Sequence, residues 1–262
     1  MAVYAIIGTG NMGGALARAL CAQGTPQNVI LFNRTPEKAA RLASELGCRT
    51  AESAAQAVAG ADYVLLGIKP VMMPGALADL GPALPEKAVL VTMAPGITME
   101  QVRGMAGRQN PVIRIMPNTP VSLGEGMTLY TVDGRVPAEA LQTFLADLSR
   151  SGRFECLPER LMDAGSAVSG CGPAFADLFL EALADGGVAC GLPRDQAYRL
   201  AAQMLVGSAR LAQQGVHPGQ LKDQVCSPGG TTIQGVRALE KSAFRSAVME
   251  AVIAAYEKSV KS

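Results

Sequence analysis

The sequence predicts an α/β domain with a mainly parallel sheet over residues 1–155, followed by an all-helical domain over residues 156–262. Two observations carry this prediction: short apolar runs alternate with helical patterns in the first part, and no strand pattern follows Pro158. Strands that alternate with crossover helices predict a sheet covered by helices on both faces. With 262 residues, of which 49% are hydrophobic, the chain is long enough for each domain to bury its own core.

The elements of the first domain follow from the period of the apolar residues. Continuous apolar runs predict buried strands, and apolar residues at three- and four-residue spacing predict helices. The strands are expected at 3–7, 29–32, 63–68, 89–93, 112–116 and 127–132, and the helices at 13–22, 36–46 and 138–148.

The second domain contains three apolar stripes at helical spacing, which are typical of helix faces that pack in a core. A helical domain of this size with wide apolar faces often completes its core with a second subunit, so a dimer is a hypothesis at this point. The stripes are Phe175, Leu178, Phe179, Ala182 and Leu183; Tyr198, Ala201, Leu205, Ala209 and Ala212; and Phe244, Ala247, Val248, Ala251 and Val252.

Composition excludes several classes of function. Lys and Arg total 23 against 22 Asp and Glu, which gives no electrostatic case for nucleic acid or an anionic membrane surface. The N-terminus has no signal-peptide pattern, and no apolar run approaches the roughly 20 residues of a membrane span. Six dispersed cysteines and one histidine indicate reduced thiols and no metal site. A soluble, cytoplasmic protein is therefore expected.

A glycine-rich motif, GTGNMG at 8–13, lies directly after a predicted strand and at the start of a helix. Gly8 permits the tight turn, Gly10 lets the backbone approach a pyrophosphate, and Gly13 allows close helix–strand packing. The amides of Asn11 and Met12, at the positive end of the helix dipole, can then hold the anion. In this context the motif predicts a Rossmann-type, doubly wound domain that binds a dinucleotide.

The end of the second strand indicates which dinucleotide is bound. An NAD enzyme typically has a carboxylate there, about 20 residues past the loop, to hold the ribose hydroxyl. This chain has Asn33, Arg34 and Thr35, with Lys38 one turn later. Arg34 can pair with a 2′-phosphate, and its neighbours can donate hydrogen bonds. NADPH is favoured, with NADH as a weaker alternative; otherwise Arg34 is simply a solvated residue at a helix start.

The segment SPGGTTIQ at 227–234 indicates a second anion site. Thr231 and Gln234 have the spacing of a capping box, so a helix is expected to start there. Gly229 and Gly230 free the preceding backbone to expose its amides, which would suit a small carboxylate, with the Thr232 hydroxyl as a further donor. The alternative is an ordinary glycine-rich turn capped by threonine.

Several other segments accompany this turn. They are GIKP at 67–70, RIMPNTP at 114–120, DAGSAVSGCGPAF at 163–175, His217-Pro218 and SPGGTTIQGVRALEK at 227–241. Together with the glycine loop they closely resemble the pyrroline-5-carboxylate reductase family, essentially from end to end. The SPGGTT block and the SG-x-GPA-aromatic block are specific to that family, whereas the glycine loop is not.

The resemblance implies reduction of L-1-pyrroline-5-carboxylate to L-proline by hydride transfer from NADPH, the last step of proline biosynthesis. It also implies an all-α domain that interlocks with its partner in a homodimer, sometimes within larger rings. Ser166 is expected near the substrate, and Lys69-Pro70 and Pro117-Asn118 beside the cofactor. The substrate carboxylate is expected on the turn, which assigns Ser227, Gly229, Gly230, Thr231 and Thr232 to substrate.

Three residues depart from the family pattern, and all leave the expected substrate anchors in place. Cys171 stands where the family usually has serine, and Phe175 replaces a common tyrosine. Pro95 replaces an alanine and removes an amide donor near the expected nicotinamide.

Catalysis is expected to depend mainly on orientation, because the sequence offers no obvious general acid. His217, the single histidine, precedes Pro218 in a predicted turn and is expected to have a structural role. A β-hydroxyacid dehydrogenase is the nearest alternative, but Ala176 stands where that family has its catalytic lysine. The other alternative is a non-catalytic NADP(H)-binding regulator.

Overall fold

A computed structural model describes residues 2–261 and divides them into two compact units. The first unit contains the residues up to 170 together with those from 256 onward, and the second contains 171–255. The division lies after Gly170, later than the predicted boundary between residues 155 and 156. The assignment of separate roles to residues 1–155 and 156–262 remains a prediction.

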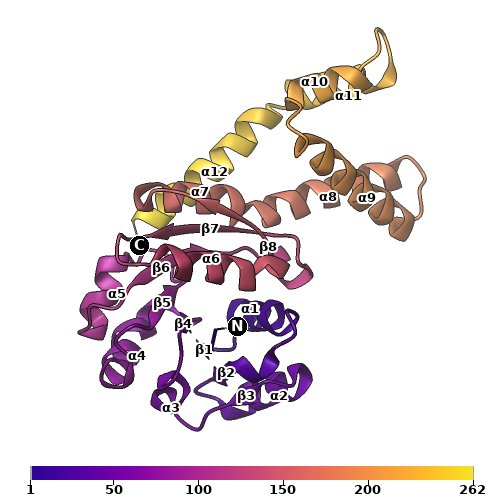
Figure 1. Cartoon of the computed structure of the whole chain (residues 1–262). Helices are drawn as coiled ribbons and strands as arrows, with labels where there is room; N and C mark the ends of the chain where they lie inside the picture. Colours follow the sequence, from indigo (N-terminus) through magenta and orange to yellow (C-terminus); the bar gives the residue numbers. More distant parts are fainter. Residues whose placement is uncertain (1, 262) are drawn as a thin grey trace. The chain divides into compact units, whose positions relative to one another are not determined.

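An eight-stranded sheet forms the centre of the first unit, in the order β3-β2-β1-β4-β5-β6-β7-β8 (Figure 1). The strands from β1 to β6 are parallel, β7 is antiparallel to β6, and β8 is parallel to β7. The predicted doubly wound α/β sheet is thus confirmed. The strands are β1 (Tyr4–Ile7), β2 (Val29–Phe32), β3 (Arg49–Thr50), β4 (Tyr63–Leu66), β5 (Val89–Thr92), β6 (Val112–Met116), β7 (Gly126–Val132) and β8 (Gly152–Cys156).

Helices cover both faces of this sheet. Along β1 the side chains alternate: Tyr4 and Ile6 belong to one apolar cluster, and Ala5 and Ile7 belong to the other. Burial on both faces explains why the strands are continuous apolar runs in the sequence. One face carries α1 (Asn11–Cys21), α2 (Pro36–Leu46) and α6 (Ala138–Asp147); the other carries α3 (Ala54–Val58), α4 (Met73–Leu80) and α5 (Met99–Ala106).

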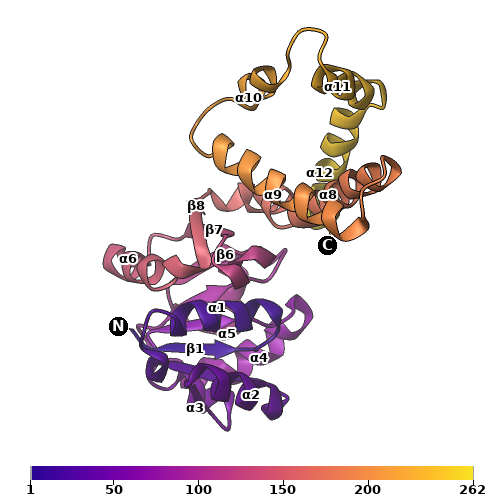
Figure 2. The ribbon, with the colours of Figure 1, turned by 90° about the vertical axis from the view of Figure 1, so that its right-hand side faces the viewer.

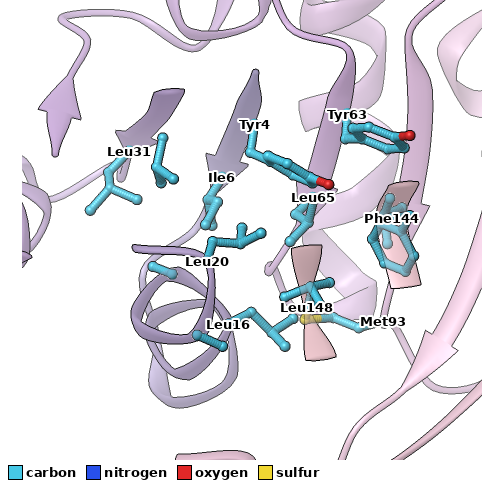
Figure 3. Packing of buried hydrophobic residues seen from close by; sticks show 14 of the residues in the cluster. Tyr4, Ile6, Leu16, Leu20, Leu31, Tyr63, Leu65, Met93, Phe144 and Leu148 are labelled. Carbon is cyan, nitrogen blue, oxygen red and sulfur yellow. The ribbon is translucent and has the colours of Figure 1, made fainter. Parts of the chain in front are cut away.

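Aromatic rings fill the cluster under α1 and α6 (Figure 3). Tyr4 and Tyr63 stack with ring centroids 4.8 Å apart, and Phe144 packs 5.7 Å from Tyr63. The Tyr4 hydroxyl donates to Asp147 Oδ2 at 2.9 Å, and the Tyr63 hydroxyl donates to the Ala140 carbonyl at 2.6 Å. Burial, with a further contribution from Asp147, raises the pKa of Tyr63 to about 12, so both phenols are neutral donors at physiological pH.

The short helix α7 (Met162–Ser169) also packs on the first unit. Met162 is fully buried against Met116 of β6 and Leu129 of β7. A single helical turn, η6 (Glu159–Leu161), leads into α7 from β8. This small third cluster extends the sheet packing beyond the elements that the sequence predicted.

The second unit consists of helices, as predicted, but it buries little by itself. Its described apolar side chains are half-buried or exposed, except for Ala184, Ala197 and Ala201. Leu178, from one predicted core stripe, is 68% exposed. Apart from Ala201, the three predicted stripes are not buried within one chain, so a core made by this chain alone is not found in the described residues of this unit. Figure 2 shows α8 (Gly172–Ala189) beside α9 (Arg194–Ala212); α10 (Pro218–Val225), α11 (Thr231–Lys241) and α12 (Phe244–Val260) follow.

The structure contains two strands that the sequence did not predict, β3 and β8. The two-residue strand β3 is exposed, and β8 alternates exposed Arg153 and Glu155 with half-buried residues. Both lie at the edges of the sheet, where a strand needs no continuous apolar run. The strands and helices that were predicted are confirmed, with small shifts at their ends.

One stretch, Glu159–Ala189, has the length and the apolar composition of a membrane-spanning helix. This corrects the expectation that no segment approaches that length. The observation is weak, because helices that pack in protein cores satisfy the same criterion. Only 11% of its most apolar window is buried inside the chain, so its apolar face needs some other cover.

Phe144→Ala is expected to lower the free energy of unfolding by about 3–5 kcal/mol, because a fully buried ring leaves a cavity among the stacked tyrosines. Urea unfolding followed by circular dichroism measures this change. Val71→Ala is the control, since Val71 is 85% exposed and should change stability by less than about 0.5 kcal/mol. Equal effects from the two substitutions would contradict this account of the core.

Candidate functional site

The glycine loop lies where β1, β4 and α1 meet. Gly8 follows β1 with a positive φ of 100°, and a Cβ there would lie 2.5 Å from the Gly67 carbonyl oxygen. A Cβ on Gly13 would lie 2.1 Å from the Gly8 carbonyl oxygen, whereas one on Gly10 would meet nothing within 4 Å. Gly8 and Gly13 therefore permit close packing, and Gly10 leaves the loop open to a ligand.

A cavity of about 570 Å³ opens at the carboxyl ends of β1, β2 and β4. In doubly wound folds ligands bind at this edge, where the strand order reverses. Apolar residues form much of its wall, including Phe32, Ile68 and Met72, and such a wall suits a flat ring. Of the predicted cofactor residues, the structure brings Gly8, Gly10, Asn33, Arg34, Thr35, Lys38 and Lys69 together around this cavity.

A second cavity of about 570 Å³ runs between α1 and α2 and shares Gly10, Asn33 and Lys38 with the first. Asn11, Arg18 and Arg41 also line it. Sequence reasoning missed Arg41, although its position three residues after Lys38 on one helix face could have indicated it.

Arg18 is occupied by an ion pair on the surface. Both of its terminal nitrogens bind Glu45, and this contact lowers the pKa of the Glu45 carboxyl. No ion pair of Lys38 or Arg41 is found in the described part of the chain, although the charge of Arg41 also acts on Glu45. Lys38 is therefore the cation of this cavity that is available to an anion.

The Asn33 amide connects two loops rather than pointing freely into the cavity. Its Oδ1 accepts from the Thr9 amide at 3.1 Å, and its Nδ2 donates to the Thr35 carbonyl at 3.0 Å. One N–H of Nδ2 is left for a ligand. The buried Thr9 hydroxyl has no partner in the described residues, so the loop still holds an unused polar atom.

Five predicted cofactor residues do not line either cavity. Gly13 is buried under the loop, Met12 packs against the core, and Pro70 begins a helical turn at 70–72. Pro117 is buried, while Asn118 donates to the Ser169 carbonyl at 3.0 Å and accepts from the Met127 amide at 2.9 Å. Contacts of these residues with a cofactor remain predictions.

The predicted substrate turn is a tight bend in the second unit. The Gly230 amide donates to the Ser227 carbonyl at 3.0 Å, and Gly229 has a positive φ of 69°. Proline second and a positive-φ glycine third are the sequence signature of a type II turn. Helix α11 starts immediately after this turn, as predicted.

The predicted capping box at this helix is wrong. Gly230, with extended backbone, is the N-cap, and Thr231 is already the first helical residue. No side chain of the described chain caps the helix, so its first amides have no partner within the helix. The exposed Thr231 and Thr232 hydroxyls lie beside these amides, and the group can accept a carboxylate.

The remaining predicted residues have local roles in the structure. Ser166 is half-buried in α7, and its carbonyl accepts from the Gly170 amide. The His217 Nδ1 accepts from the Gly219 amide at 3.0 Å, so this side chain caps α10, which confirms a structural role. Cys171 and Phe175 are half-buried, and Pro95 is exposed. The described residues contain no cluster of three metal-ligating side chains.

Two family models match the chain. The model for pyrroline-5-carboxylate reductase dimerisation matches residues 159–262. The model for NADP oxidoreductase, coenzyme F420-dependent, matches residues 3–96. These two segments contain the helical unit and the glycine loop, respectively.

Relatives along the whole chain have the same name as the dimerisation model. The pyrroline-5-carboxylate reductase of Escherichia coli is 40% identical, with 97% of this chain and 96% of that protein covered. The enzyme of Pisum sativum is 37% identical, with 97% and 93% covered. A Plasmodium falciparum pyrroline carboxylate reductase solved with NADP bound is 30% identical, with a TM-score of 0.89 over 99% of this chain and 97% of that one.

More distant structures share the fold alone. A Mycobacterium tuberculosis 3-hydroxyisobutyrate dehydrogenase is 18% identical, with a TM-score of 0.52 over 88% of this chain and 72% of that chain. An imine reductase from a Pseudomonas species is 16% identical, with a TM-score of 0.63 over 99% and 91%.

Proposed function

The chain belongs to the pyrroline-5-carboxylate reductase family, and we propose from this how its own residues carry out the family's reaction. The protein reduces L-1-pyrroline-5-carboxylate to L-proline by hydride transfer from NADPH, the last step of proline biosynthesis. The observation that carries this function is the 40% identity that extends over 97% of the chain.

The glycine loop fits the cofactor. Gly10 leaves room for a pyrophosphate beside the amides of Asn11 and Met12, and the unpartnered Thr9 hydroxyl lies in the same loop. When bound, the reduced nicotinamide supplies the hydride for the C=N carbon of the substrate. The apolar wall that includes Ile68 suits the adenine ring.

Arg34 in the first cavity and Lys38, which both cavities share, account for a preference for NADPH. Arg34 and Lys38 follow β2. The one carboxylate in this short segment, Glu37, lines neither cavity, so it does not repel a phosphate there. A guanidinium pairs with a phosphate through two parallel hydrogen bonds, and a lysine adds a point charge. NADH lacks the 2′-phosphate and is expected to bind more weakly.

The substrate carboxylate is held at the start of α11. The uncapped amides of Thr231 and Thr232, their hydroxyls and the preceding glycine turn offer several donors to one small anion. The Ser227 side chain lies against Gly230, where a Cβ would be 2.3 Å from the serine Oγ, so its hydroxyl adjoins the start of α11. Ser166 is the proposed neighbour of the imine end.

The main contribution of the protein to hydride transfer is the orientation of the substrate and the nicotinamide. A protonated iminium accepts hydride far more readily than a neutral imine, and the substrate can arrive protonated or take its proton from water. Holding the carboxylate and the nicotinamide in a fixed geometry can account for roughly 7–11 kcal/mol of the barrier. His217 has a structural contact in this chain, because its Nδ1 accepts from the Gly219 amide in the cap of α10.

The second unit completes its core with a partner chain. Residues 159–262 match the dimerisation model, and the exposed residues Leu178, Leu200 and Val248 lie on apolar helix faces in this region. A homodimer covers these faces, including that of the stretch with membrane-like composition. All six cysteines are free, which suits a reducing cytoplasm.

A β-hydroxyacid dehydrogenase is disfavoured by the residue at the position of its catalytic base. Ala176 on α8 has no group that could take a proton from an alcohol.

One measurement distinguishes the enzyme from a non-catalytic NADP(H)-binding protein. Purified protein should consume NADPH when pyrroline-5-carboxylate is added, and binding of NADPH without turnover would refute the enzymatic function.

Thr232→Ala is expected to lower kcat/KM for pyrroline-5-carboxylate by about 10- to 100-fold, because a hydrogen bond to a charged carboxylate is lost. Fluorescence titration should show unchanged NADPH affinity. Thr50→Ala, on the exposed strand β3, is the matched control and should leave both values unaltered. Normal turnover in Thr232→Ala would remove this hydroxyl from the substrate site.

The double substitution Arg34→Ala/Lys38→Ala is expected to raise the Kd of NADPH by about tenfold or more and to leave the Kd of NADH nearly unchanged. Isothermal titration with both cofactors measures this difference. Arg49→Ala is the control, because Arg49 is an exposed cation on β3 that lines neither cavity. Equal loss of affinity for both cofactors would contradict a 2′-phosphate contact.

His217→Gln is expected to keep kcat within a few-fold of the original value, while losing about 0.5–2 kcal/mol of stability through the lost cap. Steady-state kinetics and thermal unfolding measure the two effects. His217→Asn retains a good N-cap side chain and should recover the stability. A loss of kcat of about a hundredfold or more would indicate general acid catalysis instead.

A further inference from the structure

A buried arginine, Arg114, occupies the middle of β6 and has no part in the mechanism above. Its side chain is 3% exposed. Because side chains alternate along a strand, Arg114 points to the same face as Val112 and Met116, which belong to two different apolar clusters. A cation between two apolar clusters loses its hydration and therefore needs carboxylate partners.

The partners of Arg114 are Glu159, in the helical turn η6, and Asp163, at the start of α7. Nη2 lies 3.3 Å from Asp163 Oδ1, and Nη1 lies 3.6 Å from Glu159 Oε1. Each carboxylate also binds another element of the first unit. Glu159 accepts from the Met99 amide at the start of α5, and Asp163 accepts from the Ser259 hydroxyl near the C-terminus. Arg114 is thus the centre of a cluster that joins four segments.

The middle and the end of α7 are also fixed. A Cβ on Gly165 would lie 2.6 Å from Leu129 Cδ1 and 2.7 Å from Leu157 Cδ1, so the helix approaches β7 closely there. At the other end, the Asn118 side chain donates to the Ser169 carbonyl. Ser166 lies between these two contacts, on a helix that is held at three points.

We propose that Arg114 is a positioning residue whose guanidinium sets the location of α7 and thereby that of Ser166. The inference rests on the proposed function in one respect, the role of Ser166 beside the substrate. Stability alone does not call for a buried cation, since well-packed apolar residues often replace buried ion pairs without loss. The paired nitrogens of one arginine, however, specify where two carboxylates and their helix must lie.

Arg114→Lys tests this inference, because lysine keeps the charge and removes the planar pair of donors. The KM for pyrroline-5-carboxylate should rise by about tenfold or more, while the Kd of NADPH stays unchanged. Arg103→Lys is the matched control. Arg103 pairs with Asp133 in the same unit, with both side chains 16% exposed, and no ion pair joins either residue to α7 in the described residues.

A double-mutant cycle with Ser166→Ala separates the route through Ser166 from a general effect. In the Ser166→Ala background, Arg114→Lys should cause no further rise in KM. Additive effects, or equal KM changes in Arg114→Lys and Arg103→Lys, would overturn the proposal. If Ser166→Ala alone leaves KM unchanged while the original enzyme turns over normally, the role of Ser166 fails and the proposal fails with it, but the enzymatic function stands.

Asp163→Asn keeps the test decisive if Arg114→Lys does not fold. Asparagine preserves the size of the side chain and removes the charge that faces the guanidinium. It should raise the KM for the imino acid in the same way, with NADPH affinity retained. Thermal unfolding of each variant shows whether the protein is folded, and a folded Asp163→Asn with unchanged KM would overturn the proposal.

Discussion

The geometry of the cofactor cavity depends on one steric constraint, the close contact of three backbone segments at Gly8, Gly13 and Gly67. A Cβ on any of them would lie 2.1–2.5 Å from a carbonyl oxygen of another segment. With glycine at all three positions, α1 can begin directly over the ends of β1 and β4. The unpaired amides of the helix then face the cavity that the apolar wall and Arg34 complete. The anion site is therefore a consequence of how closely the sheet and its first helix approach.

The sequence was sufficient for the central sheet because those strands are buried on both faces. The run at 63–66 has no charged residue and the run at 112–116 has one, Arg114; helices on either side of the sheet explain this apolar pattern. The edge strand β8 lacks that signature, since Arg153 and Glu155 point to solvent. Most of the residues expected at the nucleotide were also predictable, because their motif is contiguous. Arg41 was not, because it belongs to a cavity that only the packing of α1 against α2 creates.

Burial in the helical unit could not be predicted from one chain. Apolar residues at helical spacing indicate a face that must be covered, but the same pattern serves an intramolecular core and a subunit interface. Only Ala184, Ala197 and Ala201 are covered within the described part of this unit. The large side chains are left for a partner, so the sequence pattern and the exposure agree once a dimer is considered.

The same pair of residue types at a spacing of three, threonine and then glutamine, has two different outcomes in this protein. At α5, Thr98 and Gln101 form a complete capping box, and the first amides of that helix are occupied. At α11, Thr231 and Gln234 have the same spacing, but the turn ending in Gly230 moves the cap one residue earlier. Local sequence cannot distinguish these cases, because the preceding turn decides which residue has the extended backbone of the cap. A helix start that leaves its own amides and two hydroxyls unused gives up capping energy. Binding of a carboxylate there would provide those hydrogen bonds. The start of α11, whose first amides are uncapped, is therefore better suited to hold substrate than the capped start of α5.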